Sequence, residues 1–340
     1  MLTILILSYN RPKELERLLE NIISELPPHS PERFKIHVAE DCSPRQDDIR
    51  IVIDGFIARF EQIGSQLVGF YNDVNLGYDA NFRSSIDRVD TEYVMIFGDD
   101  DIFEHGGLIK VNNYLESNPN LKFVLRAWRS KDIRSEKTQR FRYFPYDFNS
   151  TAKFCNLLKI FRKSIFISGL IFNTEFAKAQ MNAEYDGTLL YQLYLLTKLS
   201  DADRIGYIGE EIVCRFEGGE FFFGSSENEP DFRPNILEPQ HSLSFIRKIK
   251  IIIDRAEFSK QQKDALIKDF SKYSFSLLSI QKKSCSFFSF LKYALDLYRL
   301  GFASSGYFYV YLLMLVLLGH NLSEKIIISL KNSLRNTPRL

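Results

Sequence analysis

Glu92-Tyr-Val-Met-Ile-Phe-Gly-Asp-Asp-Asp-Ile-Phe-Glu104 is the stretch that decides how the rest of the chain is interpreted. Its apolar run, Tyr93–Phe97, is short, uninterrupted and rich in β-branched and aromatic side chains, which predicts a buried strand. Gly98 ends the run, and three consecutive carboxylates follow. We call Asp99, Asp100 and Asp101 the acidic triplet.

The acidic triplet has two interpretations. Adjacent negative charges repel each other, and hard oxygen ligands at the end of a strand suit Mg²⁺ or Mn²⁺. Aspartate is also favoured near helix N-termini, so the triplet could instead cap a helix predicted from about His105. Taken alone, the triplet does not decide between a metal site and a cap.

Length and composition predict a folded chain of two or three domains. The 340 residues are 45% hydrophobic and 14% aromatic, which does not favour disorder. No CxxC pair occurs among the cysteines, which argues against a zinc site or a disulfide framework and fits a reducing compartment. They are Cys42, Cys155, Cys214 and Cys285. Met1–Ser8 lacks a basic flank and a cleavage site, so we expect a first strand there instead of a signal peptide.

Charge is distributed unevenly along the chain. Residues 241–340 carry 16 basic and 6 acidic residues, a net charge of +10. The remaining residues carry 28 basic and 37 acidic ones, a net charge of −9. A basic tail on an acidic body favours anionic partners such as phospholipid or nucleic acid. We expect no nucleic-acid partner, because no recognised nucleic-acid-binding module is present.

Strands alternate with helices in the first third of the chain. Apolar runs predict strands at residues 2–8, 34–39, 66–71 and 93–97, and amphipathic spacing predicts helices between them. This rhythm is typical of an α/β fold with a mostly parallel sheet flanked by helices. In such sheets ligands bind outside the carboxyl ends of the strands. Asn10, Arg11, Asp41 and the acidic triplet all fall at those ends, which predicts a single site.

The expected ligand is a nucleotide sugar. No GxGxxG follows the first strand and no GxxxxGK[ST] occurs, so neither a dinucleotide fingerprint nor a P-loop is supported. The loops offer carboxylates and amides, which can recognise a base and a ribose. A metal held by the acidic triplet would neutralise a diphosphate.

Four motifs then occur in the order and spacing seen in family 2 glycosyltransferases with the GT-A fold, which this chain resembles over about residues 1–110. They are Leu5–Pro12, Glu40–Ser43, Asn75–Gly77 with Asn81, and Gly98–Asp101. The resemblance extends to bacterial polysaccharide and O-antigen-type sugar transferases, and it implies a GT-A fold and a divalent cation, Mn²⁺ or Mg²⁺.

The resemblance also implies roles for individual residues. The nucleoside pocket is expected to contain Ser8, Tyr9, Asn10, Arg11, Asp41, Asn75, Gly77 and Asn81, with Asp41 facing the base. The acidic triplet corresponds to the family's DxD motif, with Asp99 or Asp100 near the ribose and Asp101 on the metal; Asp99 is a second candidate ligand. Many members have aspartate where this chain has Gly98, so the roles within the triplet stay open.

Acceptor contacts are expected in residues 126–240, where residues 204–208 and 211–215 each predict a short strand. Residues 165–172 predict a strand whose Ser168-Gly169 pair resembles the acceptor-side strand of related transferases, and glycine there allows close approach of a substrate. The arginines and lysines of residues 126–147 indicate either a solvated loop or a clamp for an acceptor phosphate. Asp186 is our first candidate for the catalytic base, with a plain helix N-cap as the alternative for this residue, and Asp201, Asp203 and Glu217 are the other candidates. Residues 217–224 indicate a loop that closes over substrate, or a surface hairpin.

The last hundred residues are predicted to be helical. Apolar and basic side chains alternate at residues 282–299 in a pattern that suits an interfacial helix. Residues 307–318 are almost wholly apolar but shorter than the ~20 residues that span a bilayer. They predict a buried core helix or a peripheral membrane contact over residues 282–318, which would place the protein in the cytoplasm, on the inner face of the membrane.

Together these patterns predict three parts: a nucleotide-sugar half (1–125), an acceptor half of the same GT-A domain (126–240) and a basic helical region (241–340). The predicted function is inverting, metal-dependent transfer from a nucleotide-diphosphate sugar to a glycan or a polyprenyl-diphosphate-linked acceptor in surface polysaccharide synthesis. A nucleotidyltransferase and a non-catalytic binding module are the alternatives.

Overall fold

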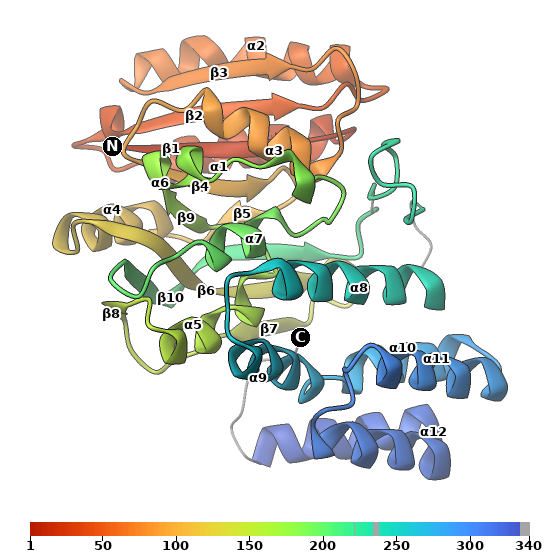
Figure 1. The fold of residues 1–340 in the computed structure, drawn as a ribbon. Helices are drawn as coiled ribbons and strands as arrows, with labels where there is room; N and C mark the ends of the chain where they lie inside the picture. The colour runs from red at the N-terminus through yellow and green to blue at the C-terminus, as the bar shows by residue number, and fades with distance from the viewer. Residues whose placement is uncertain (221, 234–237, 334–340) are drawn as a thin grey trace.

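The computed structural model describes residues 1–220, 222–233 and 238–333, and within them one mixed sheet forms the centre of the molecule (Figure 1). Its strand order is β3-β2-β1-β4-β9-β6-β10-β5, with β7 paired to β6 and β8 paired to β10. The strands are β1 (Leu2–Ser8), β2 (Phe34–Glu40), β3 (Gln66–Tyr71), β4 (Tyr93–Gly98), β5 (Ile102–Phe103), β6 (Leu121–Asp132), β7 (Thr138–Phe141), β8 (Phe148–Thr151), β9 (Leu170–Asn173) and β10 (Arg204–Glu217).

Helices cover both faces of this sheet and form the C-terminal part. The α-helices are α1 (Pro12–Glu25), α2 (Gln46–Gln62), α3 (Tyr78–Asp87), α4 (Gly107–Ser117), α5 (Phe154–Ile160), α6 (Thr174–Ala179), α7 (Tyr191–Thr197), α8 (Pro239–Arg255), α9 (Lys260–Ser271), α10 (Phe275–Ser284), α11 (Phe287–Arg299) and α12 (Gly306–Ser333). Three short 3₁₀ turns, η1 (Pro31–Arg33), η2 (Arg162–Ser164) and η3 (Ala183–Tyr185), complete the described elements.

The four strands β3, β2, β1 and β4 are parallel, as the sequence predicts. The side chains of β1, β2 and β4 are almost wholly buried because helices pack on both faces, whereas most residues of the edge strand β3 are half-buried. Apolar residues of α1 at helical spacing, Leu15, Leu18, Leu19 and Ile22, fill the core beneath β1. Since the strands run in one direction, their carboxyl ends meet at one edge of the sheet.

The second half of the sheet is mixed, and two of its strands differ from the prediction. β9 starts only at Leu170 and runs antiparallel to β4 and β6, because residues 165–169, which follow the 3₁₀ turn η2, form bends and turns instead of a strand. The two short strands expected at residues 204–208 and 211–215 form one strand, β10, in which register shifts relative to β6 lie on either side of Glu211. This antiparallel return brings Ser168 and Gly169 next to the end of β4.

Helices α8 to α12 form the C-terminal region, which lies at the end of the molecule opposite α2 and β3 (Figure 1). α9 starts with a full capping box, in which Ser259 accepts from the backbone of Gln262 and the Gln262 side chain accepts from the backbone of Ser259. α12 is interrupted at Gly319, whose backbone angles (φ 73°, ψ 177°) are not helical. The expectation that residues 307–318 form a buried core helix is wrong, since 11% of the most apolar window of α12 is buried and the rest is half-buried or exposed.

His37 in β2 gives this fold a testable pH dependence. Its ring packs edge-on against Phe70 at 5.0 Å, its Nδ1 is buried without a partner, and burial lowers its pKa to about 4. The unfolded chain binds the proton near pH 6.5, so the stability contributed here is full above pH 6.5 and falls as the pH drops toward 4.

We therefore expect His37→Leu to make unfolding less sensitive to acid. The difference in free energy of unfolding between variant and parent should shift by about 1–3 kcal/mol in favour of the variant from pH 7 to pH 4. Urea denaturation at several pH values measures this difference. Parallel pH curves for the two proteins would contradict the assignment.

Candidate active site

At the carboxyl ends of β1 and β4, several of the predicted site residues gather around Asp99. This buried carboxylate accepts a hydrogen bond from the backbone N–H of Tyr9 (3.0 Å) and one from the Arg11 guanidinium (3.0 Å). Arg11 also lies 3.4 Å from the more exposed Asp100. Burial raises the pKa of Asp99 to about 6, although Arg11 opposes the shift. Residues 8–11 and the acidic triplet therefore form one charged cluster.

The acidic triplet does not cap a helix. The short strand β5 follows it directly, and α4 starts later, behind Gly106, with no side-chain cap. The N–H of Gly106 instead donates to Glu25 at 2.6 Å. The capping interpretation is therefore wrong, and the triplet is left facing the edge of the sheet where parallel strands end.

Asp101 has a buried carboxyl oxygen that no protein group satisfies. Its Oδ2 accepts a hydrogen bond from the Ser168 hydroxyl, which in turn accepts from the Gly98 N–H at 3.0 Å. Its Oδ1 is buried and has no partner. Burial and the neighbouring Asp100 raise the pKa of Asp101 to about 8. A buried oxygen without a donor costs free energy unless a ligand or cation satisfies it.

Two polar side chains at the end of β1 also have a buried atom that forms no hydrogen bond. Ser8 Oγ and Asn10 Oδ1 are buried and have no hydrogen-bond partner. Asn10 adopts a left-handed conformation (φ 62°), which asparagine tolerates better than most residues. The loop after β1 thus presents polar groups that are available to a ligand.

Asp41 fixes the shape of the neighbouring loop. Its Oδ1 accepts from the Asn72 side chain (2.8 Å) and the Leu76 N–H (2.9 Å), and its Oδ2 accepts from the Gly77 N–H (2.8 Å). Burial raises the pKa of Asp41 to about 6, while these bonds oppose the shift. The carboxylate therefore holds the loop before α3 against the end of β2.

Asn81 ties α3 to the same place. Its amide donates to the carbonyl of Ala39 at 3.1 Å, and its oxygen accepts from Asn72 at 3.0 Å. The predicted residues Asp41, Gly77 and Asn81 thus belong to one buried hydrogen-bond network, in which Asn72 bridges Asp41 and Asn81.

The segment at residues 222–233 packs over these loops. Phe222 lies edge-on to Tyr9 (5.6 Å) and beneath the Arg11 guanidinium (5.0 Å). Ser226 donates to the carbonyl of Asn75 at 3.1 Å, and Asn228 donates to the carbonyl of Leu76 at 2.7 Å. Of the two interpretations for residues 217–224, these contacts favour a loop that closes over the site. Residue 221 lies outside the described residues.

Glu229 anchors this segment, and sequence reasoning missed it. The buried carboxylate accepts from the Tyr78 N–H (2.8 Å) and from the Gly224 N–H (2.6 Å). Gly77 is required beside it, because it adopts φ +80° and a Cβ there would come within 2.9 Å of the Glu229 carboxylate. An isolated acidic residue in a polar loop gives no sequence signal of this kind.

We expect Glu229→Ala to weaken nucleotide binding about tenfold, because two backbone N–H groups lose their acceptor and the loop at residues 75–78 loosens. Titration of a bound nucleotide by calorimetry measures this change. Glu227→Ala is the matched control, since Glu227 is exposed in the same segment. Equal affinity of the two variants would contradict the anchoring role.

Asp186 lies in an ion pair. Both of its oxygens accept from Arg83, at 3.0 Å and 2.7 Å. It does not cap a helix N-terminus, because it ends η3 and α7 begins only at Tyr191. The alternative of a plain N-cap is therefore wrong. Its role as catalytic base stays a prediction, and that role requires the ion pair with Arg83 to open.

Two further charged side chains, Asp79 and Arg126, shape the site, and the sequence did not predict their burial. Asp79 accepts from the hydroxyl of Thr188 (3.0 Å) and the backbone N–H groups of Leu189 (2.6 Å) and Tyr191 (2.9 Å), which fixes the turn after Asp186. Burial raises the pKa of Asp79 to about 7. A carboxylate in the first turn of an amphipathic helix gives no hint that it is buried.

Arg126 in β6 is fully buried and donates to the carbonyls of Ser168 (2.7 Å) and Phe166 (2.8 Å). Burial lowers its pKa to about 10. The solvated-loop interpretation is wrong for this residue. Arg126 thus holds the segment that contains Ser168. Since the Ser168 hydroxyl donates to Asp101, Arg126 helps to position the acidic triplet.

The carboxylates of this site would suit a divalent cation that is bound together with a substrate phosphate. Within the described residues, no three His, Cys, Asp or Glu side chains gather into a preformed cage. Asp99 is engaged by Tyr9 and Arg11, whereas Asp101 has a free buried oxygen. Mg²⁺ and Mn²⁺ sites on phosphate substrates commonly use one or two carboxylates, with phosphate and water completing the shell.

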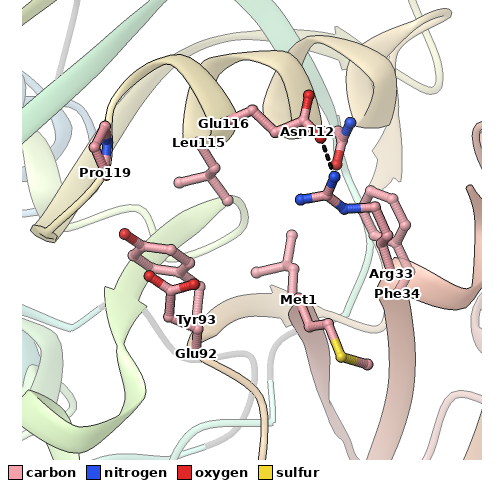
Figure 2. Close-up of a pocket in the computed structure, with 10 residues that line it drawn as sticks. Met1, Arg33, Phe34, Glu92, Tyr93, Asn112, Leu115, Glu116 and Pro119 are labelled. Atoms are coloured by element: carbon pink, nitrogen blue, oxygen red, sulfur yellow. Dashed lines mark hydrogen bonds and ion pairs between the residues drawn. The ribbon is translucent and has the colours of Figure 1, made fainter.

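A pocket elsewhere in the molecule holds none of the predicted residues. Figure 2 shows it at the amino ends of β1, β2 and β4, with Met1, Tyr93 and the Arg33–Glu116 ion pair on its walls. Its volume is about 210 Å³. It lies at the edge of the sheet opposite the acidic triplet, so it plays no part in the site described above.

Comparison with known proteins fits this geometry. The model of the family described as glycosyl transferase family 2 matches residues 3–172, which is half of the chain. The chain therefore belongs to glycosyl transferase family 2. The match ends inside β9, so it includes every strand that contributes to the acidic cluster.

Among curated proteins, an uncharacterized glycosyltransferase of Haemophilus influenzae is 25% identical over 124 residues, 36% of this chain and 37% of the relative. Abequosyltransferase RfbV of Salmonella typhimurium is 28% identical over 129 residues, 37% of this chain and 36% of the relative. The chain thus matches little more than a third of the length of these two relatives.

Solved structures of S. aureus TarS share the fold. The complex of TarS 1–349 with UDP-GlcNAc has a TM-score of 0.60 at 14% identity, covering 88% of this chain and 80% of the TarS 1–349 chain. The UDP complex of the same fragment gives 0.60 at 15% identity, covering 87% of this chain and 78% of the fragment. The GT-A-like architecture, with its C-terminal helical region, is confirmed.

Proposed function

We propose that this protein is an inverting, metal-dependent glycosyltransferase that moves a sugar from a nucleotide-diphosphate donor to a glycan or a polyprenyl-diphosphate-linked acceptor in bacterial surface polysaccharide synthesis. The observation that carries the proposal is the cluster at the carboxyl ends of β1 and β4, where Asp99 engages Tyr9 and Arg11 and Asp101 keeps a free oxygen. Membership of glycosyl transferase family 2 supports the reaction type.

The names of the relatives support the donor class. RfbV is an abequosyltransferase, and the TarS structures contain UDP-GlcNAc or UDP. By analogy, the pocket between Asp41 and Asn10 would receive the nucleoside, and Arg11 would lie beside the ribose and diphosphate. Asp101 would hold the divalent cation, which would neutralise charge on the departing diphosphate.

In this reaction the acceptor hydroxyl oxygen attacks the anomeric carbon of the donor from the face opposite the diphosphate. The new glycosidic C–O bond forms as the C–O bond to the diphosphate breaks, and the nucleoside diphosphate leaves. The hydroxyl proton passes to a carboxylate base. Asp186 remains our candidate, and release of Arg83 by the incoming acceptor would free its oxygens.

Release of nucleoside diphosphate tests the proposal. Purified protein is incubated with a panel of UDP-, GDP-, CDP- and dTDP-sugars, and the nucleotide products are separated by liquid chromatography. We expect slow release of one nucleoside diphosphate, its loss with EDTA and its recovery with Mn²⁺ or Mg²⁺. Binding of a nucleotide sugar without release would favour a non-catalytic module. Release of pyrophosphate from a nucleoside triphosphate with a sugar phosphate would favour a nucleotidyltransferase.

A further inference from the structure

Helix α12 has two apolar faces, and only one of them is covered. Phe308 and Leu315 are buried, and Tyr311 packs edge-on to Phe275 of α10 at 5.4 Å. On another face, large apolar side chains recur at helical spacing and are exposed: Tyr307, Val310, Leu313 and Leu317. Leu317 exposes 70% of its surface. A stripe of this kind is typical of a surface that binds a membrane or a partner.

Helix α11 repeats the arrangement. Phe290, Tyr293, Ala294 and Leu297 are buried against the rest of the C-terminal region. A second row, three to four residues apart, is exposed and consists of Phe288, Leu291, Leu295 and Tyr298. Phe288, at 82% exposure, is the most extreme of them. Two adjacent helices in the sequence thus each leave an apolar row uncovered.

The break at Gly319 limits what α12 can do in a bilayer. One described helix, Gly306–Leu330, is long and apolar enough to cross a membrane, and 11% of its most apolar window is buried. Gly319 divides it, so the apolar part before the break is about 13 residues or ~20 Å long, shorter than a ~30 Å hydrocarbon core. The geometry favours a helix lying along the surface of a bilayer.

The basic side chains near these exposed rows favour binding to an anionic surface. Lys292 and Arg299 are exposed on α11, Lys283 is exposed in the last turn of α10, and Lys282 lies 4.8 Å from the ring of Phe287. Residues 241–340 carry a net charge of +10, whereas the rest of the chain carries −9. Apolar rows flanked by basic side chains match the headgroup region of a bilayer with anionic lipids.

We propose that α11 and α12 form a membrane-docking surface that rests on the anionic cytoplasmic leaflet, with the rows Phe288–Tyr298 and Tyr307–Leu317 inserted among the lipid headgroups. The surface belongs to the region at the far end of the molecule from α2 and β3 (Figure 1). Within the proposed function, docking selects the lipid-linked acceptor over a soluble glycan. The docking itself does not depend on the transferase activity.

Vesicle co-sedimentation of the full chain tests the surface. Vesicles of phosphatidylglycerol and phosphatidylethanolamine are compared with vesicles of phosphatidylcholine alone. We expect binding to the anionic vesicles that is at least about tenfold stronger and that weakens with salt. Leu313→Glu/Leu317→Glu and, separately, Phe288→Glu/Leu295→Glu should each reduce binding at least about tenfold. Lys283→Glu/Lys292→Glu should reduce only the anionic component.

Ile51→Glu is the matched control, because Ile51 is 71% exposed on α2 at the opposite end, and its binding should equal that of the parent. Absence of binding to anionic vesicles, or equal loss in the control, would overturn the proposal. A stable dimer in light scattering that Leu313→Glu/Leu317→Glu dissociates, without vesicle binding, would show that a second copy covers the face. Nucleotide-induced thermal shifts of the same variants report separately on the proposed function.

Discussion

Asp101→Asn is expected to lower turnover at least about 10³-fold while the protein stays folded, because the substitution replaces the carboxyl group that would bind the cation, whose buried Oδ1 lacks a protein partner. The Ser168 hydroxyl can donate to the new amide oxygen or accept from its NH₂ group, so we expect the free energy of unfolding to change by no more than ~1 kcal/mol. Initial rates with the active donor, together with chemical denaturation, measure both effects.

A second readout separates the metal role from a general structural role. Addition of Mn²⁺ should strengthen nucleotide binding by the parent and have little effect on the variant. Asp48→Asn, an exposed aspartate paired with Arg45 on α2, should match the parent in every measurement. Retained activity in Asp101→Asn would remove this residue from the metal site.

Asp41→Ala is the substitution with the second largest expected effect. It removes the acceptor of three hydrogen bonds, two of them from the backbone N–H groups of Leu76 and Gly77. We expect the free energy of unfolding to fall by about 2–4 kcal/mol, because buried donors lose their partner. Nucleotide affinity should fall about 10–100-fold, since the loop that forms one wall of the pocket is released.

Asp41→Asn distinguishes the effect of the carboxylate's charge from that of its shape. The amide keeps one acceptor oxygen, so it should retain part of the stability but place an NH₂ group against a backbone N–H. Urea denaturation and calorimetric nucleotide titration of both variants measure the effects. An alanine variant with unchanged stability and affinity would show that the loop before α3 does not depend on Asp41.

The parallel half of the fold could be predicted because its strands are short apolar runs separated by amphipathic helices. The strands at residues 2–8 and 66–71 have the predicted bounds, and β2 and β4 each extend one residue further. The mixed half could not be predicted, because the pairing direction of its strands depends on contacts between residues far apart in the sequence. β9 is set by its hydrogen bonds to β4 and β6, and nothing in residues 165–172 specifies where that pairing begins.

The candidate site was also predictable in part. The residues at strand ends were predictable because parallel strands bring their carboxyl ends to one edge. The contacts that hold these residues were not, since Glu229, Ser168 and Arg126 come from distant segments, and no pattern in the sequence shows what they contact. Asp186 shows the same limit, because its ion pair with Arg83 joins residues 103 positions apart.

The measurement that tests the central claim most directly is a thermal-shift panel of UDP, GDP, CDP and dTDP, each with and without Mn²⁺. If the edge formed by β1 and β4 is a metal-assisted nucleotide site, one nucleotide should raise the melting temperature only when metal is present. At 100 times its dissociation constant that ligand should stabilise the protein by about 2.7 kcal/mol. A flat response to all four nucleotides, from protein shown to be folded, would contradict the account.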